Sequence, residues 1–130
     1  MRVILGAFFI VGLLLSIASV GCSGENPTES FGQMAQSGKT SFLSKCATCH
    51  GANGQGGIGP PLIGTTNIPL AYPTAANLLK IITTTMPRES PGGLSTSKYQ
   101  QILSYLLVQN NWVDPGDLFD VDGLTQVTLK

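Results

Sequence analysis

Two cysteines and a histidine lie close together in the segment Cys46-Ala47-Thr48-Cys49-His50, which has the pattern C-x-x-C-H. Two intervening residues allow one tight turn to present both thiols on the same side, and the imidazole follows directly. Thiols at this spacing can add to the two vinyl groups of one porphyrin, while the imidazole reaches the iron from below. The pattern therefore predicts covalent attachment of one c-type haem through Cys46 and Cys49, with His50 as an axial ligand of the iron.

Other uses of a C-x-x-C pair fit this chain less well. A thioredoxin-like redox pair requires a βαβ context, and no segment shows the alternating pattern of a strand. A structural zinc site requires four ligands, whereas the whole chain contains three cysteines and one histidine. Once Cys22 is assigned to the N-terminal anchor described below, no thiol remains for a disulfide or for a nucleophile.

Met86 is the candidate for the second axial ligand of the iron. It lies in Thr84-Thr85-Met86-Pro87, just past a predicted helix, where Pro87 ends the helix and stiffens the backbone. Met34 precedes the C-x-x-C-H segment and is expected to pack within a helix. A core role is the usual one for a lone methionine, and a lysine ligand or an open site are further alternatives. Ligation by histidine and methionine would raise the reduction potential and fill both axial positions.

Residues 1–21 have the pattern of a secretory signal peptide. One basic residue, Arg2, precedes an apolar run over residues 3–20. The run ends in Ser19-Val20-Gly21-Cys22, which resembles a bacterial lipobox, so Cys22 is expected to be lipidated and to become the mature N-terminus. An uncleaved transmembrane anchor is the alternative, because a run of this length just spans a bilayer. Both alternatives predict a membrane-anchored protein outside the cytoplasm, on the periplasmic or cell-surface side.

The rest of the chain divides into a tether, one domain and a tail. Residues 22–32 are polar and contain Pro and Gly, which is typical of a flexible tether. Residues 33–112 are expected to form one compact domain, and residues 113–130 a C-terminal tail. Its four aspartates, at positions 114–122, are expected to be solvated rather than to form a docking patch. From Cys22 onwards six basic and seven acidic residues give a net charge of −1, which does not favour a nucleic-acid partner.

Hydrophobic periodicity predicts an all-α fold with three main helices and long loops. The first is expected over residues 33–46, the second over residues 74–84 with Thr74 as N-cap, and the third over residues 96–109 with Ser95 as N-cap. Residues 51–64 form a Gly/Pro-rich loop without periodicity. A domain of this size has a marginal apolar core, so a covalently held haem would supply the missing apolar centre.

Taken in order, these segments resemble a class I bacterial cytochrome c over about residues 38–110. The resemblance is carried by four segments: Gly38-x-x-x-Phe42-x-x-x-Cys46, the C-x-x-C-H motif, Gly59-Pro60-Pro61-Leu62-Ile63-Gly64, and Met86-Pro87 followed by Pro91-Gly92-Gly93-Leu94-Ser95. It implies a small cytochrome c fold wrapped around one haem. The stretch from Met86 onwards is also similar to cytochrome subunits that serve quinoprotein dehydrogenases.

The resemblance implies roles for individual residues. Pro60 would accept a hydrogen bond through its carbonyl from the free N–H of His50 and so fix the imidazole, although a plain loop proline is the alternative. Leu62 and Leu94 would form walls of the haem site. Gly38 would allow the first and last helices to cross closely.

The predicted function is electron transfer without enzymatic activity. We expect a membrane-tethered mono-haem cytochrome c that shuttles single electrons between an extracytoplasmic dehydrogenase and a terminal oxidase or another cytochrome. The alternative from a different class is a haem enzyme or gas sensor, in which Met86 would be displaceable. A purely structural subunit that anchors a partner enzyme through its lipid is a third hypothesis.

Overall fold

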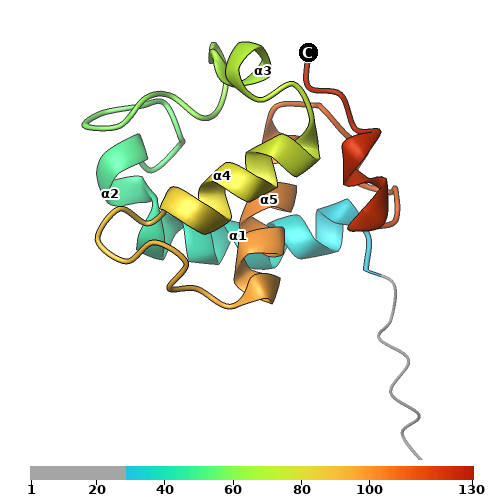
Figure 1. Cartoon of the computed structure of the whole chain (residues 1–130), viewed down its shortest axis with the longest axis horizontal. Coiled ribbons are helices and arrows are strands. Elements are labelled where there is room, and N and C mark those ends of the chain that lie inside the picture. Colours follow the sequence, from blue (N-terminus) through green and yellow to red (C-terminus); the bar gives the residue numbers. More distant parts are fainter. Residues whose placement is uncertain (1–28) are drawn as a thin grey trace, which may run out of the picture.

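The computed structural model describes residues 29–130, and all regular elements of this part are helical (Figure 1). The elements are α1 (Phe31–Lys45), α2 (Ala47–His50), α3 (Ile68–Ala71), α4 (Ala75–Thr85), α5 (Thr96–Gln109) and the 3₁₀ helix η1 (Asp122–Thr125). Within the described residues the only β interactions are two isolated bridges, Ser30 with Leu118 and Thr74 with Thr128. The predicted all-α class is therefore confirmed.

The three predicted helices are present, and their caps explain where they begin. Thr74 and Ser95 cap α4 and α5 as expected, because each side chain accepts a hydrogen bond from a backbone N–H three residues later. The first helix begins two residues earlier than predicted. Ser30 and Gln33 form a reciprocal capping box that fixes its start. The one-turn helices α2 and α3 were not predicted.

Helices α1 and α5 cross closely at Gly38, as the sequence predicted. A Cβ at this position would overlap the backbone carbonyl of Gln101 and would lie 3.0 Å from Cβ of Tyr105. Beside the crossing, the rings of Phe42 and Tyr105 pack with their centroids 5.3 Å apart. This contact fixes α1, which leads into the C-x-x-C-H segment, against the C-terminal helix.

The expectation of a solvated tail over residues 113–130 is wrong for its apolar residues. Leu124 and Leu129 are 1% and 4% exposed and belong to a core cluster that also contains Phe31 and Leu107. Backbone hydrogen bonds hold the segment to the body of the fold, among them Leu129 N–H to the carbonyl of Pro73. The four aspartates between them remain exposed, as expected. The folded domain thus extends beyond residue 112.

The predicted signal peptide, Cys22 and most of the tether lie outside the described residues. Among residues 29–130, no helix is both long enough and apolar enough to cross a bilayer.

Candidate functional site

The turn from Cys46 to His50 places the two thiols and the imidazole at the end of α1. Cys46 N–H still donates to the carbonyl of Phe42, at 2.8 Å, so the cysteine continues directly from α1. Its own carbonyl accepts from Cys49 N–H at 3.2 Å and from His50 N–H at 2.9 Å. This single turn separates the cysteines by three positions, which puts both side chains on the same side of α2.

The imidazole of His50 is held by the loop that follows it. Its Nδ1 lies 2.7 Å from the carbonyl oxygen of Pro60, which is the contact expected from the sequence. Because a carbonyl can only accept, Nδ1 carries the proton and Nε2 is left as the nitrogen with a free lone pair. The side chain is 8% exposed. The ring is therefore fixed in both tautomer and orientation.

The same loop is hydrogen-bonded back onto the C-x-x-C-H turn. Gly56 N–H donates to the carbonyl of His50, and Gly59 N–H donates to that of Cys49, each at 2.8 Å. Gly59 passes so close to the imidazole that an added Cβ would lie 2.7 Å from its Cε1. A side chain at this position would push the ring away.

Met86 reaches the site from the other side, where α4 ends. Its backbone N–H donates to the carbonyl of Ile82 at 3.2 Å, and its carbonyl accepts from the hydroxyl of Tyr99 at 2.7 Å. The Tyr99 hydroxyl also accepts from Leu94 N–H at 3.4 Å. The backbone that carries Met86 is thus held on both sides.

A cavity lies between the His50 loop and the end of α4, and it has two adjoining lobes of about 170 Å³ and 460 Å³. Six residues line both lobes: His50, Pro60, Leu62, Ile82, Met86 and Leu106. The smaller lobe also reaches both cysteines, Phe42 and Leu94, whereas the larger one extends to Thr65, Thr66, Asn67 and Tyr72. The cavity is therefore apolar near the cysteines and gains polar side chains at its far end.

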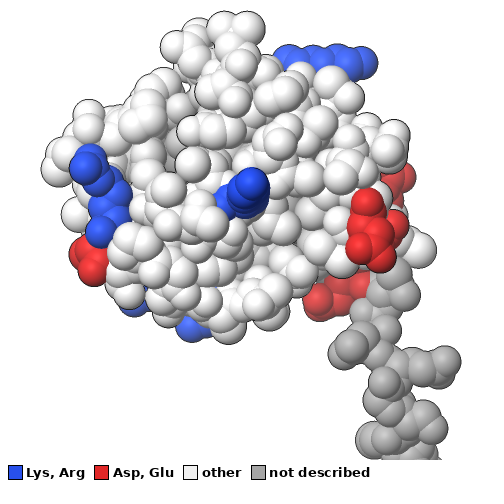
Figure 2. Space-filling view, in the orientation of Figure 1, with Lys and Arg blue, Asp and Glu red and all other residues white. Residues whose placement is uncertain are grey.

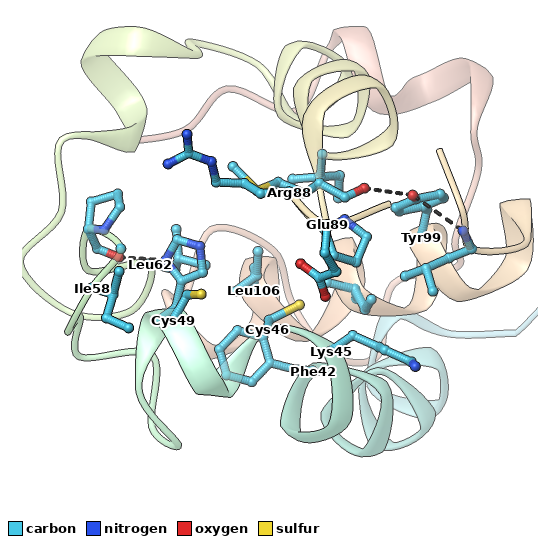
Figure 3. Close-up of a pocket in the computed structure, with 18 residues that line it drawn as sticks. Phe42, Lys45, Cys46, Cys49, Ile58, Leu62, Arg88, Glu89, Tyr99 and Leu106 are labelled. Atoms are coloured by element: carbon cyan, nitrogen blue, oxygen red, sulfur yellow. Dashed lines mark hydrogen bonds between the residues drawn. The ribbon is translucent and has the colours of Figure 1, made fainter. Parts of the chain in front are cut away.

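Charged residues surround the lobe that contains the cysteines. Figure 3 shows Lys45 beside Phe42 and Cys46, Glu89 above Cys46, and Arg88 across the opposite side of the opening. Burial raises the pKa of the Cys46 thiol to about 11, with smaller contributions from Glu89 and Cys49. In the polypeptide alone this thiol is thus neutral near pH 7.

The structure brings together all the candidate residues that it describes. Cys46, Cys49, His50, Met86 and Pro60 line the smaller lobe, and so do Leu62 and Leu94. Cys22 lies outside the described residues.

Sequence reasoning missed three contributions to the site. These are the hydroxyl of Tyr99, the backbone approach of Gly59 to the imidazole, and Asn110, which holds the Pro60 loop. A tyrosine inside a stripe of leucines and isoleucines is one available signal, because a buried hydroxyl needs a hydrogen-bond partner.

These residues fit a porphyrin attached by two thioether bonds. Both thiols border a cavity with apolar walls, and the free Nε2 of His50 and the thioether of Met86 belong to residues on opposite sides of that cavity. The described residues contain no group of three or more His, Cys, Asp or Glu side chains that could hold a bare metal ion. The donor set is thus suited to iron in a macrocycle rather than to an ion bound by the protein alone.

Comparison with known proteins agrees with this chemistry. Residues 33–106, more than half of the chain, match the family described as cytochrome c oxidase, cbb3-type, subunit III. No curated protein matches the sequence.

Among solved structures, the chain resembles the sulfane dehydrogenase SoxCD from Paracoccus pantotrophus, with a TM-score of 0.63 and 26% identity over 73% of this chain. The match spans about half, 52%, of that chain. Cytochrome cL from Hyphomicrobium denitrificans gives a TM-score of 0.47 and 17% identity over 80% of this chain and 71% of its own. Cytochrome cL from Methylophaga aminisulfidivorans gives 0.42 and 18%, covering 63% of each chain.

The family match covers the C-x-x-C-H turn, the Pro60 loop and the Met86 segment together. The chain therefore belongs to the family of cytochrome c oxidase, cbb3-type, subunit III, and is a c-type cytochrome with one haem c attached through Cys46 and Cys49.

Proposed function

We propose that the protein is a membrane-tethered mono-haem cytochrome c that shuttles single electrons between an extracytoplasmic dehydrogenase and a terminal oxidase or another cytochrome. The observation that carries the proposal is the placement of His50 and Met86, which come from two different loops and line both lobes of one cavity. In this proposal His50 Nε2 and the Met86 sulfur are the axial ligands of the iron. With both axial positions filled, no site remains for a substrate on the metal.

The haem, when attached, supplies a one-electron change between ferric and ferrous iron. The chain fixes the geometry around it. Pro60 holds the His50 ring through Nδ1, so the ligating nitrogen does not have to reorient when the charge on the iron changes. Leu62, Leu94 and Leu106 line the cavity and exclude water, which favours the reduced, less charged iron.

Electrons would leave and enter at the edge of the cavity that lies near the cysteines. Ile58, which lines the smaller lobe, is 87% exposed, so this edge carries an apolar side chain in solvent. We expect partners to dock over residues 54–57 and 86–91, beside Ile58. A transient redox contact needs only a small interface, and an exposed apolar residue next to a charged rim suits one.

The comparisons support the two partner classes. The matching family is described as a subunit of an oxidase, and the similar solved structure is a sulfane dehydrogenase. An acceptor of the first kind and a donor of the second kind fit a small carrier with no substrate site of its own.

The membrane tether depends on Cys22. A Cys22→Ser variant should lose the lipid and appear in the soluble extracytoplasmic fraction, whereas the unchanged protein should fractionate with membranes. Mass spectrometry of the mature N-terminus checks this directly. Membrane retention of the variant would instead favour an uncleaved transmembrane anchor.

Replacing Met86 tests the ligation, and Met34 offers a matched control. Met34 is 5% exposed and contacts the hydroxyl of Ser104 through its sulfur, at 3.8 Å, away from the cavity. In Met86→Leu the near-infrared sulfur-to-iron charge-transfer band of the oxidised protein should vanish, and the reduced protein should bind carbon monoxide rapidly. Met34→Leu should keep the band. Rapid carbon monoxide binding by the unchanged protein would favour the haem enzyme or gas sensor.

A further inference from the structure

Two polar side chains of α5 reach the two loops that supply the proposed axial ligands. Tyr99 lies in the first turn of the helix, and Asn110 caps its C-terminal end. They are eleven positions apart, which is about three helical turns, so both side chains leave the same face about 16 Å apart along the axis. The face between them is buried and carries Ile102 and Leu106, both of which line the cavity.

Tyr99 closes the loop that begins at Met86. Its hydroxyl donates to the Met86 carbonyl at 2.7 Å and accepts from the N–H of Leu94 at 3.4 Å, so one oxygen joins both ends of the segment (Figure 3). The tyrosine is 4% exposed, and its ring is packed in the wall of the cavity. A short hydrogen bond in such surroundings restricts the position of the Met86 backbone.

Asn110 closes the loop that carries Pro60. Its Nδ2 donates to the carbonyls of Leu62 and Leu106, each at 2.9 Å, and its Oδ1 accepts from Gly64 N–H at 3.0 Å. The amide therefore ties residues 62–64 to the end of α5. Leu62 is two residues from Pro60, whose carbonyl receives the His50 hydrogen bond.

We propose that Tyr99 and Asn110 are positioning residues, which use α5 as a rigid spacer to set the loops of Met86 and His50 relative to each other. The inference rests on the proposed ligation by these two residues. Neither side chain need touch the iron. Each one fixes a backbone carbonyl or N–H next to a ligand, and the helix between them keeps the two fixed points apart.

Tyr99→Phe tests the Met86 side, and Tyr105→Phe is its control. Both changes remove one hydroxyl from α5 and keep the ring, but among residues 29–130 no hydrogen bond of the Tyr105 hydroxyl is found. Imidazole is titrated into the oxidised, haem-loaded full chain, and loss of the sulfur-to-iron band is followed. Tyr99→Phe should bind imidazole about fivefold more tightly, the ratio that one net hydrogen bond provides. Equal affinities for the two variants would overturn the role of Tyr99.

Asn110→Leu tests the His50 side, and Gln109→Leu is its control, because Gln109 is an exposed neighbour on the same helix. The readouts are the electron paramagnetic resonance g-values of the oxidised protein and the NMR shifts of the His50 ring protons. Both depend on the orientation of the imidazole. Asn110→Leu should shift them, and Gln109→Leu should leave them unchanged. Identical spectra for the two variants would overturn the role of Asn110.

The unchanged protein separates failure of this inference from failure of the proposed ligation. If its oxidised form lacks the sulfur-to-iron band, Met86 is not a ligand and both proposals fall. If the band is present and each variant behaves as its control does, only the positioning role is wrong. Thermal unfolding of all four variants, followed by circular dichroism, shows whether a spectral change reflects general loss of structure.

Discussion

Among single residues, Gly59 determines whether the imidazole of His50 can occupy its observed position. An added Cβ would lie 2.7 Å from Cε1 and 2.8 Å from Nδ1 of the ring, which is itself held by Pro60. Gly59→Ala should therefore displace the ring or the loop and lower the free energy of unfolding by about 1–3 kcal/mol, as other overpacking changes do. Thermal or denaturant unfolding of the haem-loaded protein measures the stability change.

Gly116→Ala is a suitable comparison for this change. Gly116 is exposed, and its added Cβ would meet only a carboxylate oxygen of Asp114, at 3.2 Å. The control should keep the unfolding midpoint and the His50 ring resonances of the unchanged protein. If Gly59→Ala also kept both, close packing of the backbone against the imidazole would be unimportant for its position.

For an element, the prediction with the largest structural consequence concerns the crossing of α1 and α5. Gly38→Ala places a methyl group against the carbonyl of Gln101, where the two backbones leave no room. The helices must separate, so we expect a loss of about 1–3 kcal/mol, although alanine is the better helix former. Ser37→Ala, on the exposed neighbouring position, should change stability by no more than about 0.5 kcal/mol. Denaturant unfolding distinguishes these outcomes, and equal stabilities would refute a tight crossing.

The helices were predictable because their signals are local. Periodicity and the caps Thr74 and Ser95 define α4 and α5, and Gly38 marks the close crossing. The C-x-x-C-H spacing likewise identifies the attachment site from five adjacent residues. The contacts of Asn110 were not predictable, because they join residues 46 and 48 positions apart and depend on how the loop folds. One-turn helices such as α2 are too short to show a periodic pattern.

In the molecule as a whole, the C-terminal segment completes the core on the side away from the haem motif. Charge made residues 113–130 look like a solvated tail, yet Leu124 and Leu129 alternate with exposed polar residues and turn inward. Leu124→Ala should lower the free energy of unfolding by about 2–5 kcal/mol, the usual cost of emptying a buried leucine site. Leu118→Ala is the control, because Leu118 is 62% exposed. Equal unfolding midpoints would show that the segment is not part of the cooperative core.

The anchor and the electron-transfer edge lie at opposite ends of the molecule. Helix α1 begins at Phe31, next to the proposed tether, and ends at Lys45, directly before Cys46 (Figure 1). Its fifteen residues span about 22 Å. Exposed acidic residues gather beside the start of α1, whereas Lys45 and Arg88 flank the cavity (Figure 2). An anionic bilayer repels the acidic end, so the tethered domain should present its haem edge to the solvent.

This orientation predicts that tethering leaves the reaction with soluble partners unchanged. The lipidated protein in anionic vesicles and the Cys22→Ser variant in solution should be oxidised by the same soluble redox protein with similar second-order rate constants. Stopped-flow absorbance of the haem measures both. If the vesicle-bound protein reacted many times more slowly, and recovered its rate when the lipid was removed, the haem edge would face the bilayer. Tether and site would then have to be arranged differently from the geometry that α1 imposes.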